Sequence, residues 1–102
     1  MATIKFYYRS TKETANITLR LMHQVSKEEI ISIYGRTKFR IDKSTWNETR
    51  KKTIKDAELR NSKVDIEKEL TNLENFVLSN TPADIREINK EWLTDTINEY
   101  YN

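Results

Sequence analysis

The sequence predicts an α+β fold: a three-stranded antiparallel β-sheet packed against a C-terminal α-helix, with a further short helix at the C-terminus. Two periodicities lead to this prediction. Apolar and polar residues alternate in the first half of the 102-residue chain, as in half-buried strands, whereas apolar residues in the second half recur with helical spacing. Leu, Ile, Val and Phe make up about a quarter of the chain and the net charge is +2, which favours one folded domain, alone or with an appendage, over disorder.

Strands are expected near residues 3–9, 15–22 and 29–35, followed by a short extended segment near 38–41, so that the sheet spans residues 3–41. The polar stretches 10–15 and 23–28 have the length of hairpin loops. Gly35, the only glycine, is expected to mark a bend or bulge where the last segment begins. The expected apolar face of the sheet consists of Ile4, Phe6, Tyr8, Ile17, Leu19, Leu21, Ile31 and Ile33.

A helix is expected near residues 57–79, because Asp56 can cap its start and one apolar stripe follows. This helix is the expected cover of the sheet. Pro82 ends it and suits the first position of a new helix, and Asn89 is another candidate cap. The stripe of the long helix consists of Leu59, Ile66, Leu70, Leu73 and Val77, and that of the short helix of Trp92, Leu93, Ile97 and Tyr100 or Tyr101.

The opposite face of the predicted sheet collects basic, aromatic and hydroxyl side chains and no acid. Such a face suits the DNA major groove, where Arg can pair with guanine and Lys can neutralise phosphates. The predicted DNA-binding residues on it are Lys5, Tyr7, Arg9, Thr18, Arg20, Tyr34, Arg36, Lys38 and Arg40, with Met22 and Ser32 beside them. An ordinary solvated sheet face is the alternative, and exposed tyrosines leave RNA open as a ligand.

A second basic feature comprises Arg50, Lys51 and Lys52, with Lys55 nearby. As a loop before the helix it would follow the phosphate backbone, and it is therefore included among the DNA-binding candidates; a solubilising flexible loop is the alternative. The charges also separate along the chain, with thirteen Lys/Arg against five Asp/Glu in residues 1–55 and five against eleven in residues 56–102. This asymmetry indicates a polyanionic partner for the first half.

Composition excludes several other functions. The chain has no cysteine, so disulfides, thiolate zinc sites and cysteine nucleophiles are excluded, and His23 is the only histidine. One glycine cannot build a glycine-rich phosphate loop. No catalytic set converges, so we expect no enzyme activity, no cofactor and no metal. The sequence has no apolar run of membrane-span length and no signal-peptide stretch, so we expect no membrane partner and a cytoplasmic location.

The order of these elements resembles the N-terminal arm-type DNA-binding domain of tyrosine recombinases, the integrases of phages and conjugative transposons. Trp46, which we expect to be a core anchor, matches the tryptophan turn with which the family ends its sheet. The other residues that carry the resemblance are 4–9, 16–22, 29–35, 38–41 and 44–47, then the basic stretch 50–55, the helix near 57–79 and residues 88–93.

The resemblance implies binding to double-stranded DNA at accessory arm sites of a site-specific recombinase, in DNA integration and recombination in bacteria and their mobile elements. Residues 1–80 would form the arm-type domain, and residues 81–102 a linker and short helix leading toward a core-binding domain not present in this chain. The family's catalytic Arg, His-x-x-Arg and Tyr set cannot be placed here, and Tyr100 and Tyr101 lack activating arginines. The implied partners are double-stranded DNA and other protomers of the parent recombinase.

A protein-interaction module is the second hypothesis. Here the sheet edge or the acidic C-terminal helix would dock a partner protein, and the apolar side chains of Trp92, Leu93 and Tyr101 would stay partly uncovered. Binding that is insensitive to salt, or self-association lost on removal of residues 82–102, would favour this hypothesis over DNA binding. A stand-alone enzyme is a third and more remote hypothesis.

Overall fold

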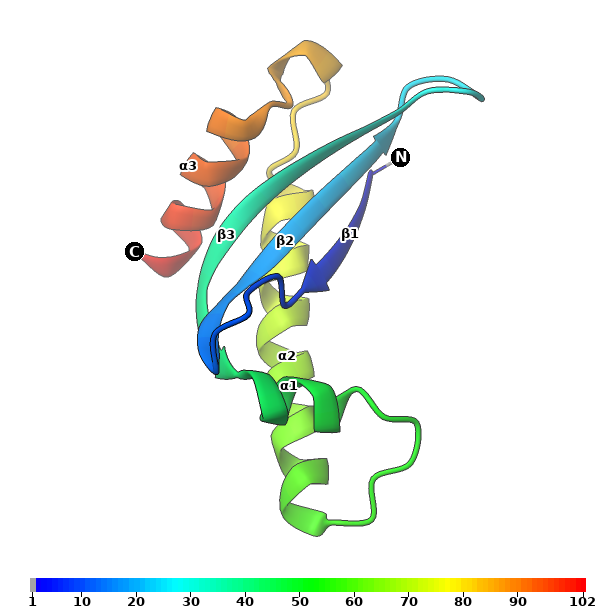
Figure 1. Ribbon diagram of the computed structural model, residues 1–102. Helices are drawn as coiled ribbons and strands as arrows, with labels where there is room; N and C mark the ends of the chain where they lie inside the picture. The colour runs from blue at the N-terminus through cyan, green and yellow to red at the C-terminus, as the bar shows by residue number, and fades with distance from the viewer. Residues whose placement is uncertain (1) are drawn as a thin grey trace.

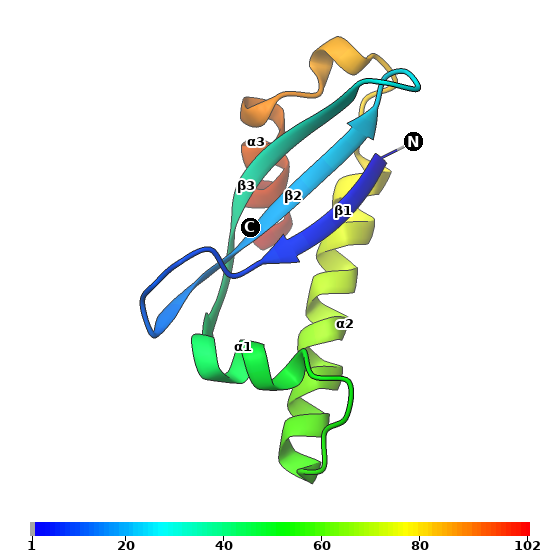
Figure 2. The same ribbon diagram turned by 45° about the vertical axis from the view of Figure 1, so that its right-hand side comes forward.

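The computed structural model describes residues 2–102 and confirms the α+β fold (Figure 1). Three antiparallel strands lie in the order β1-β2-β3, and helices α2 and α3 lie on the same side of this sheet (Figures 1 and 2). The elements are β1 (Ala2–Tyr7), β2 (Thr14–Gln24), β3 (Ile30–Asp42), α1 (Lys43–Thr49), α2 (Ala57–Ser79), the 3₁₀-helix η1 (Ile85–Glu87) and α3 (Lys90–Tyr101).

All three predicted strands are present, but their bounds differ from the prediction. β1 ends at Tyr7 rather than at residue 9, because the chain turns there and the Tyr8 hydroxyl donates to the Lys12 carbonyl at 2.6 Å. β2 is longer at both ends, and β3 is one strand of 13 residues that includes the two segments predicted separately. A long β2–β3 hairpin therefore forms the centre of the sheet and one of its edges.

The β2–β3 ladder has one irregularity. Thr18 pairs with Arg36 and Asn16 with Arg40, so β3 carries two residues more than β2 between these pairs. The Thr37 hydroxyl donates to the Ile17 carbonyl at 2.8 Å, and the Asn16 side-chain amide donates to the Thr37 carbonyl at 2.9 Å. Because the excess is an even number of residues, the alternation of faces continues through the irregularity, and residues 36, 38 and 40 are all exposed.

Gly35 has a different role from the one predicted. It pairs with Leu19 in regular register, and the irregularity lies beyond it, so its assignment as a bend or bulge is wrong. A Cβ atom at Gly35 would lie 2.6 Å from Ile97 Cδ1 and 3.1 Å from the Leu93 side chain. The missing side chain therefore allows α3 to approach β3 closely.

The long helix agrees with the prediction in both its bounds and its cap. The Asp56 carboxylate accepts hydrogen bonds from the backbone N–H groups of Glu58 at 2.8 Å and Leu59 at 3.3 Å. Asn89 caps α3 through the Trp92 N–H at 2.9 Å, whereas Pro82 lies in a non-helical segment ahead of η1 and begins no helix. Among residues 2–102, no helix is long and apolar enough to cross a membrane.

Helix α1 was not predicted, although its tryptophan was identified as a core anchor. Trp46 is only 5% exposed and packs with Ile17, Ile41 and Leu70, which confirms that role. This cluster joins the start of β2, the end of β3 and the middle of α2. It therefore holds the chain where it passes from the sheet to the long helix.

Helix α3 shares the main hydrophobic core, so the sheet has two covering helices rather than the single lid expected. Leu93 and Ile97 are fully buried and belong to one cluster with Leu19, Leu21 and Leu73, which come from β2 and α2. The predicted domain boundary at residue 80 therefore separates side chains that pack together. That residues 81–102 lead toward a further domain stays a prediction.

Candidate functional site

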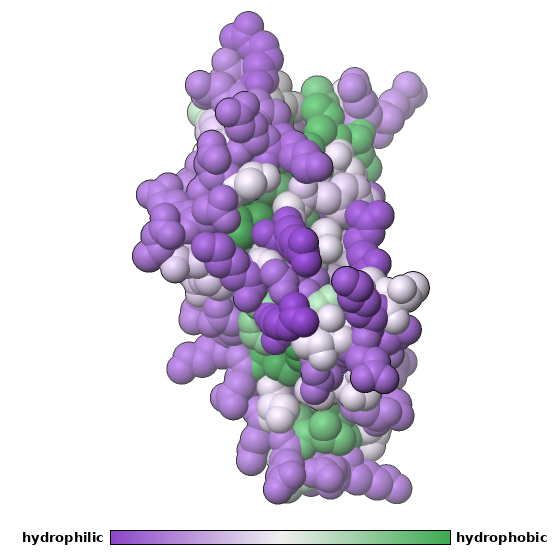
Figure 3. Space-filling model, turned by 60° about the vertical axis from the view of Figure 1, so that its left-hand side comes forward, coloured by the Kyte–Doolittle hydropathy of each residue, from purple (hydrophilic) through white to green (hydrophobic). Residues whose placement is uncertain are grey.

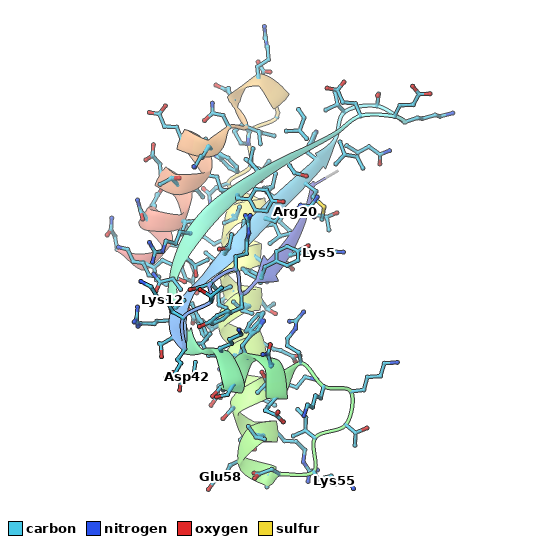
Figure 4. The ribbon with its side chains drawn as sticks, viewed as in Figure 1. Lys5, Lys12, Arg20, Asp42, Lys55 and Glu58 are labelled. Atoms are coloured by element: carbon cyan, nitrogen blue, oxygen red, sulfur yellow. The ribbon has the colours of Figure 1, made fainter. Side chains whose placement is uncertain are left out.

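The face of the sheet opposite α2 and α3 carries basic, aromatic and hydroxyl side chains, and we call it the basic face. The strand register places Lys5, Arg20 and Tyr34 in one cross-strand row, and Tyr7, Thr18 and Arg36 in the next. Figure 4 shows Lys5 and Arg20 on the side of the sheet away from the long helix. The residues of the basic face are Lys5, Tyr7, Arg9, Thr18, Arg20, Ser32, Tyr34, Arg36, Lys38 and Arg40.

Arg20 lies at the centre of the basic face and is held by its neighbours. Its guanidinium donates to the Ser32 hydroxyl at 3.1 Å and makes a long contact of 3.5 Å with the Tyr7 hydroxyl. Arg9 follows β1 instead of lying in it, yet its Cζ atom lies 4.6 Å from the centre of the Tyr34 ring, and that of Arg20 lies 5.8 Å from it. Two cations thus share one aromatic ring.

No carboxylate neutralises this cluster within the described residues. The three ion pairs found among residues 2–102 join Lys51 to Glu48, Lys63 to Glu67 and Arg86 to Asp84, and none includes a cation of the basic face. The acids near this face are Glu13 and Asp42 at the α1 end of the sheet, where Asp42 accepts from the Thr14 hydroxyl at 2.8 Å. Adjacent guanidinium groups without counter-charges favour an anionic ligand.

A shallow hollow of about 380 Å³ extends the basic face around Arg36. Five cationic side chains line it: Arg9, Lys12, Arg36, Arg40 and Lys90. The remaining lining residues are neutral, and Ser10, Thr14, Asn16, Thr18 and Tyr34 among them contribute polar groups. A smaller hollow of about 200 Å³ lies beside it, between Tyr7, Arg9, Arg20 and Tyr34. Cationic side chains of the basic face therefore line both of these hollows.

The loop that carries Lys12 is held in place by Tyr8. Partial burial raises the pKa of the Tyr8 hydroxyl, the Asp42 carboxylate raises it further, and Arg40 opposes these effects. A tyrosine hydroxyl is protonated at neutral pH even without this shift, and here it donates a hydrogen bond to the Lys12 carbonyl. Lys12 and Asp42 lie at the same end of the sheet, away from Arg20 (Figure 4).

The second predicted basic feature joins the basic face only in part. The Arg50 Cζ atom lies 4.8 Å from the centre of the Trp46 ring, and Arg50 lines a hollow with Lys5 and Tyr7 at the β1 edge. Lys51 pairs with Glu48 at 2.9 Å and Lys52 is exposed in the loop. Lys55 lies at the foot of α2, far from Lys5 and Arg20 in Figure 4. Of this group, Arg50 alone is shown beside residues of the basic face, at the β1 edge of the sheet.

Sequence reasoning missed two cations of the hollow, for different reasons. Lys12 had a local signal, since it lies in the loop directly after Arg9 and a short loop keeps its residues near the strand ends. Lys90 had none, because it reaches the hollow only through the packing of α3 against β3. Figure 3 shows the surface on this side of the molecule as mainly hydrophilic, with small and separate apolar areas.

The described residues offer no metal-binding site as an alternative to the basic face. Among residues 2–102, no group of three or more His, Asp or Glu side chains is arranged to hold a metal ion. Tyr101 is partly buried, and burial raises the pKa of its hydroxyl, an effect opposite to that needed for a nucleophile.

Comparison with known proteins finds no family model, no curated protein and no solved structure that matches the chain.

Proposed function

We propose that this chain binds double-stranded DNA by placing the basic face in the major groove, as the arm-site-binding part of a site-specific recombinase. One observation carries the DNA-binding proposal: the Arg and Lys side chains of one open sheet face have no carboxylate within ion-pair distance among the described residues. Such a face gains free energy from phosphate neutralisation and from the release of condensed counterions.

The dimensions of the sheet suit a groove. Neighbouring strands lie about 4.8 Å apart, so the outer strands of a three-stranded sheet are roughly 10 Å apart. The major groove of B-DNA is about 12 Å wide and is known to admit β-strands. In this arrangement the middle strand β2 would lie over the base edges, and β1 and β3 would face the two phosphate backbones.

The position of each side chain suggests its role. Arg20 on β2 is central, and its guanidinium matches the paired acceptors O6 and N7 of guanine. Its contacts with Tyr7 and Ser32 restrict its orientation before DNA binds. Lys5 on β1 and the exposed Arg36, Lys38 and Arg40 on β3 occupy the outer strands, where phosphates would lie.

The recombinase role is supported by the resemblance of the sequence to arm-type domains. In that role the chain would bind accessory DNA sites away from the crossover point and would help to regulate integration against excision. Protein interaction stays the competing hypothesis. Of the three apolar side chains expected to be partly uncovered, Leu93 is fully buried against the sheet, whereas Trp92 and Tyr101 are partly buried.

Fluorescence anisotropy of a labelled mixed-sequence duplex, titrated at several salt concentrations, tests the proposal. We expect affinity to fall steeply with salt. The double variant Lys5→Gln/Lys38→Gln, which removes two exposed cations of the outer strands, should lower the slope of log affinity against log salt by about two. Lys63→Gln/Lys68→Gln on α2 changes the net charge equally and should leave the slope unchanged.

Two results would contradict this function. Absence of binding at low salt would leave the basic face as ordinary surface, and an equal effect of both double variants would assign binding to net charge alone. Stronger competition by single-stranded RNA than by duplex DNA would indicate that the exposed tyrosines stack unpaired bases.

A further inference from the structure

We infer that the hollow around Arg36 is a phosphate site and that α3 supplies part of it through Lys90. As a contact to the DNA backbone this inference rests on the proposed function; as a site for a phosphate group it stands independently. The hollow is formed by Arg9 and Lys12 from the β1–β2 loop, Arg36 and Arg40 from β3, and Lys90 from α3.

The packing of α3 explains why Lys90 reaches this hollow. Leu93 and Ile97 follow Lys90 by three and seven residues, so all three lie on one side of the helix. Leu93 and Ile97 lie against Gly35 on the covered face of the sheet, and Lys90 begins the helix beside the same strand. Gly35 and Arg36 also line the hollow, so Lys90 reaches it at the β3 edge.

The chemistry of the hollow matches phosphate. Three guanidinium and two ammonium groups are available, and Arg binds phosphate oxygens through paired N–H donors. Hydroxyl and amide groups line the same surface and suit the remaining oxygen lone pairs. The acidic neighbours of Lys90, Glu87 and Glu91, line a separate hollow with Trp92 and Asp95.

A functional consequence follows for the C-terminal segment. If Lys90 holds a phosphate, α3 is part of the binding surface as well as of the core. Undocking α3 from Gly35 would then remove one cation from the site without changing any residue of the sheet. The position of α3 would thereby be coupled to the affinity for the ligand.

The test uses Lys90→Gln and Arg36→Gln in the full chain, with Lys68→Gln on the exposed surface of α2 as the charge-matched control. Pyrophosphate titration followed by amide NMR is the first arm. We expect shifts that saturate at residues 9–12, 36 and 90, and weaker binding in the two hollow variants. Circular dichroism confirms that each variant is folded.

Duplex DNA titration is the second arm. Each hollow variant should lower the salt slope by about one. Its loss of affinity relative to the parent chain should therefore be about eightfold larger at 0.1 M salt than at 1 M salt, whereas Lys68→Gln should show no such difference. Loss in both arms supports a phosphate site used for DNA, and loss in the pyrophosphate arm alone supports a site for a free phosphate compound. No effect of Lys90→Gln or Arg36→Gln in either arm overturns the inference. If Lys5→Gln/Lys38→Gln, two cations of the basic face outside the hollow, still weakens DNA binding in that case, the proposed function stands without this site.

Discussion

At the scale of single residues, Arg20 has the most defined environment of the basic face. It lies on the middle strand, contacts the side chains of Tyr7 and Ser32, and has a buried Nε atom without a partner among the described residues. A guanidinium held by neutral hydroxyl groups has no carboxylate as an ion-pair partner and has a restricted orientation. Both properties suit recognition of a planar pair of acceptors.

We predict that Arg20→Ala weakens binding to the preferred DNA site by about 1–3 kcal/mol, because a paired contact to a base is lost. Arg20→Lys should keep the salt slope while losing sequence preference, since an ammonium cannot reproduce the paired geometry. Selection of a preferred site followed by competition titrations measures both effects. Unchanged preference in both variants would remove Arg20 from base recognition.

Lys5 should behave differently from Arg20, because it is exposed on the outer strand β1. We predict that Lys5→Ala weakens binding to all sequences alike and reduces the salt slope by about one, as expected for a phosphate contact. Salt-dependent anisotropy on two unrelated duplexes measures this. A loss confined to one duplex would instead assign Lys5 to base recognition.

At the scale of elements, local signals determined α2 most completely. Its bounds agree with the prediction because the cap, the first acidic turn and the apolar stripe all lie within the helix itself. Helix α1 was missed because its seven residues are too few for a periodic pattern, and tertiary packing of Trp46 stabilises it. Strand β3 was predicted as two segments because Gly35 was expected to be a bend, whereas it pairs with Leu19 in regular register.

The cap of α2 gives a prediction for stability. Asp56→Ala removes the acceptor of two backbone N–H groups and should lower the free energy of unfolding by about 1 kcal/mol. Asp65→Ala, on the exposed side of the same helix, removes a carboxylate without a capping role and should change it by less than about 0.5 kcal/mol. Urea unfolding compares the two variants, and equal effects would show that the cap contributes nothing.

At the scale of the whole molecule, the contact between Gly35 and Ile97 joins the sheet to α3. Gly35→Ala would place a methyl group 2.6 Å from Ile97 Cδ1 and should destabilise the fold by about 1–3 kcal/mol. Ile97→Val removes that Cδ1 atom and should cost about 0.5–1.5 kcal/mol alone. The double variant should lose less than the sum of the two, because the shortest contact is absent and only the contacts of 3.1 Å with the Leu93 side chain remain. Additive losses in urea unfolding would show that α3 does not lie on Gly35.

The sequence by itself determined the elements whose signals are local. Alternation along β1, β2 and β3 assigned Lys5, Tyr7, Arg20 and Tyr34 to one face, because successive side chains of a strand point to opposite sides. Lys38 and Arg40, which were expected to extend this face, do lie on it, since the irregularity in β3 inserts an even number of residues. The location of this irregularity, beyond Gly35, could be assigned only from the register of both strands.

The tertiary structure alone decided how distant segments meet. The packing of α3 on Gly35, the arrival of Lys90 beside Arg36 and the position of Arg50 at the β1 edge have no pattern in the chain. Such contacts depend on which apolar stripe covers which part of the sheet, and the stripes of α2 and α3 both pack on the same face. The missing side chain of Gly35 allows the close approach of α3, and this packing places Lys90 beside the basic face.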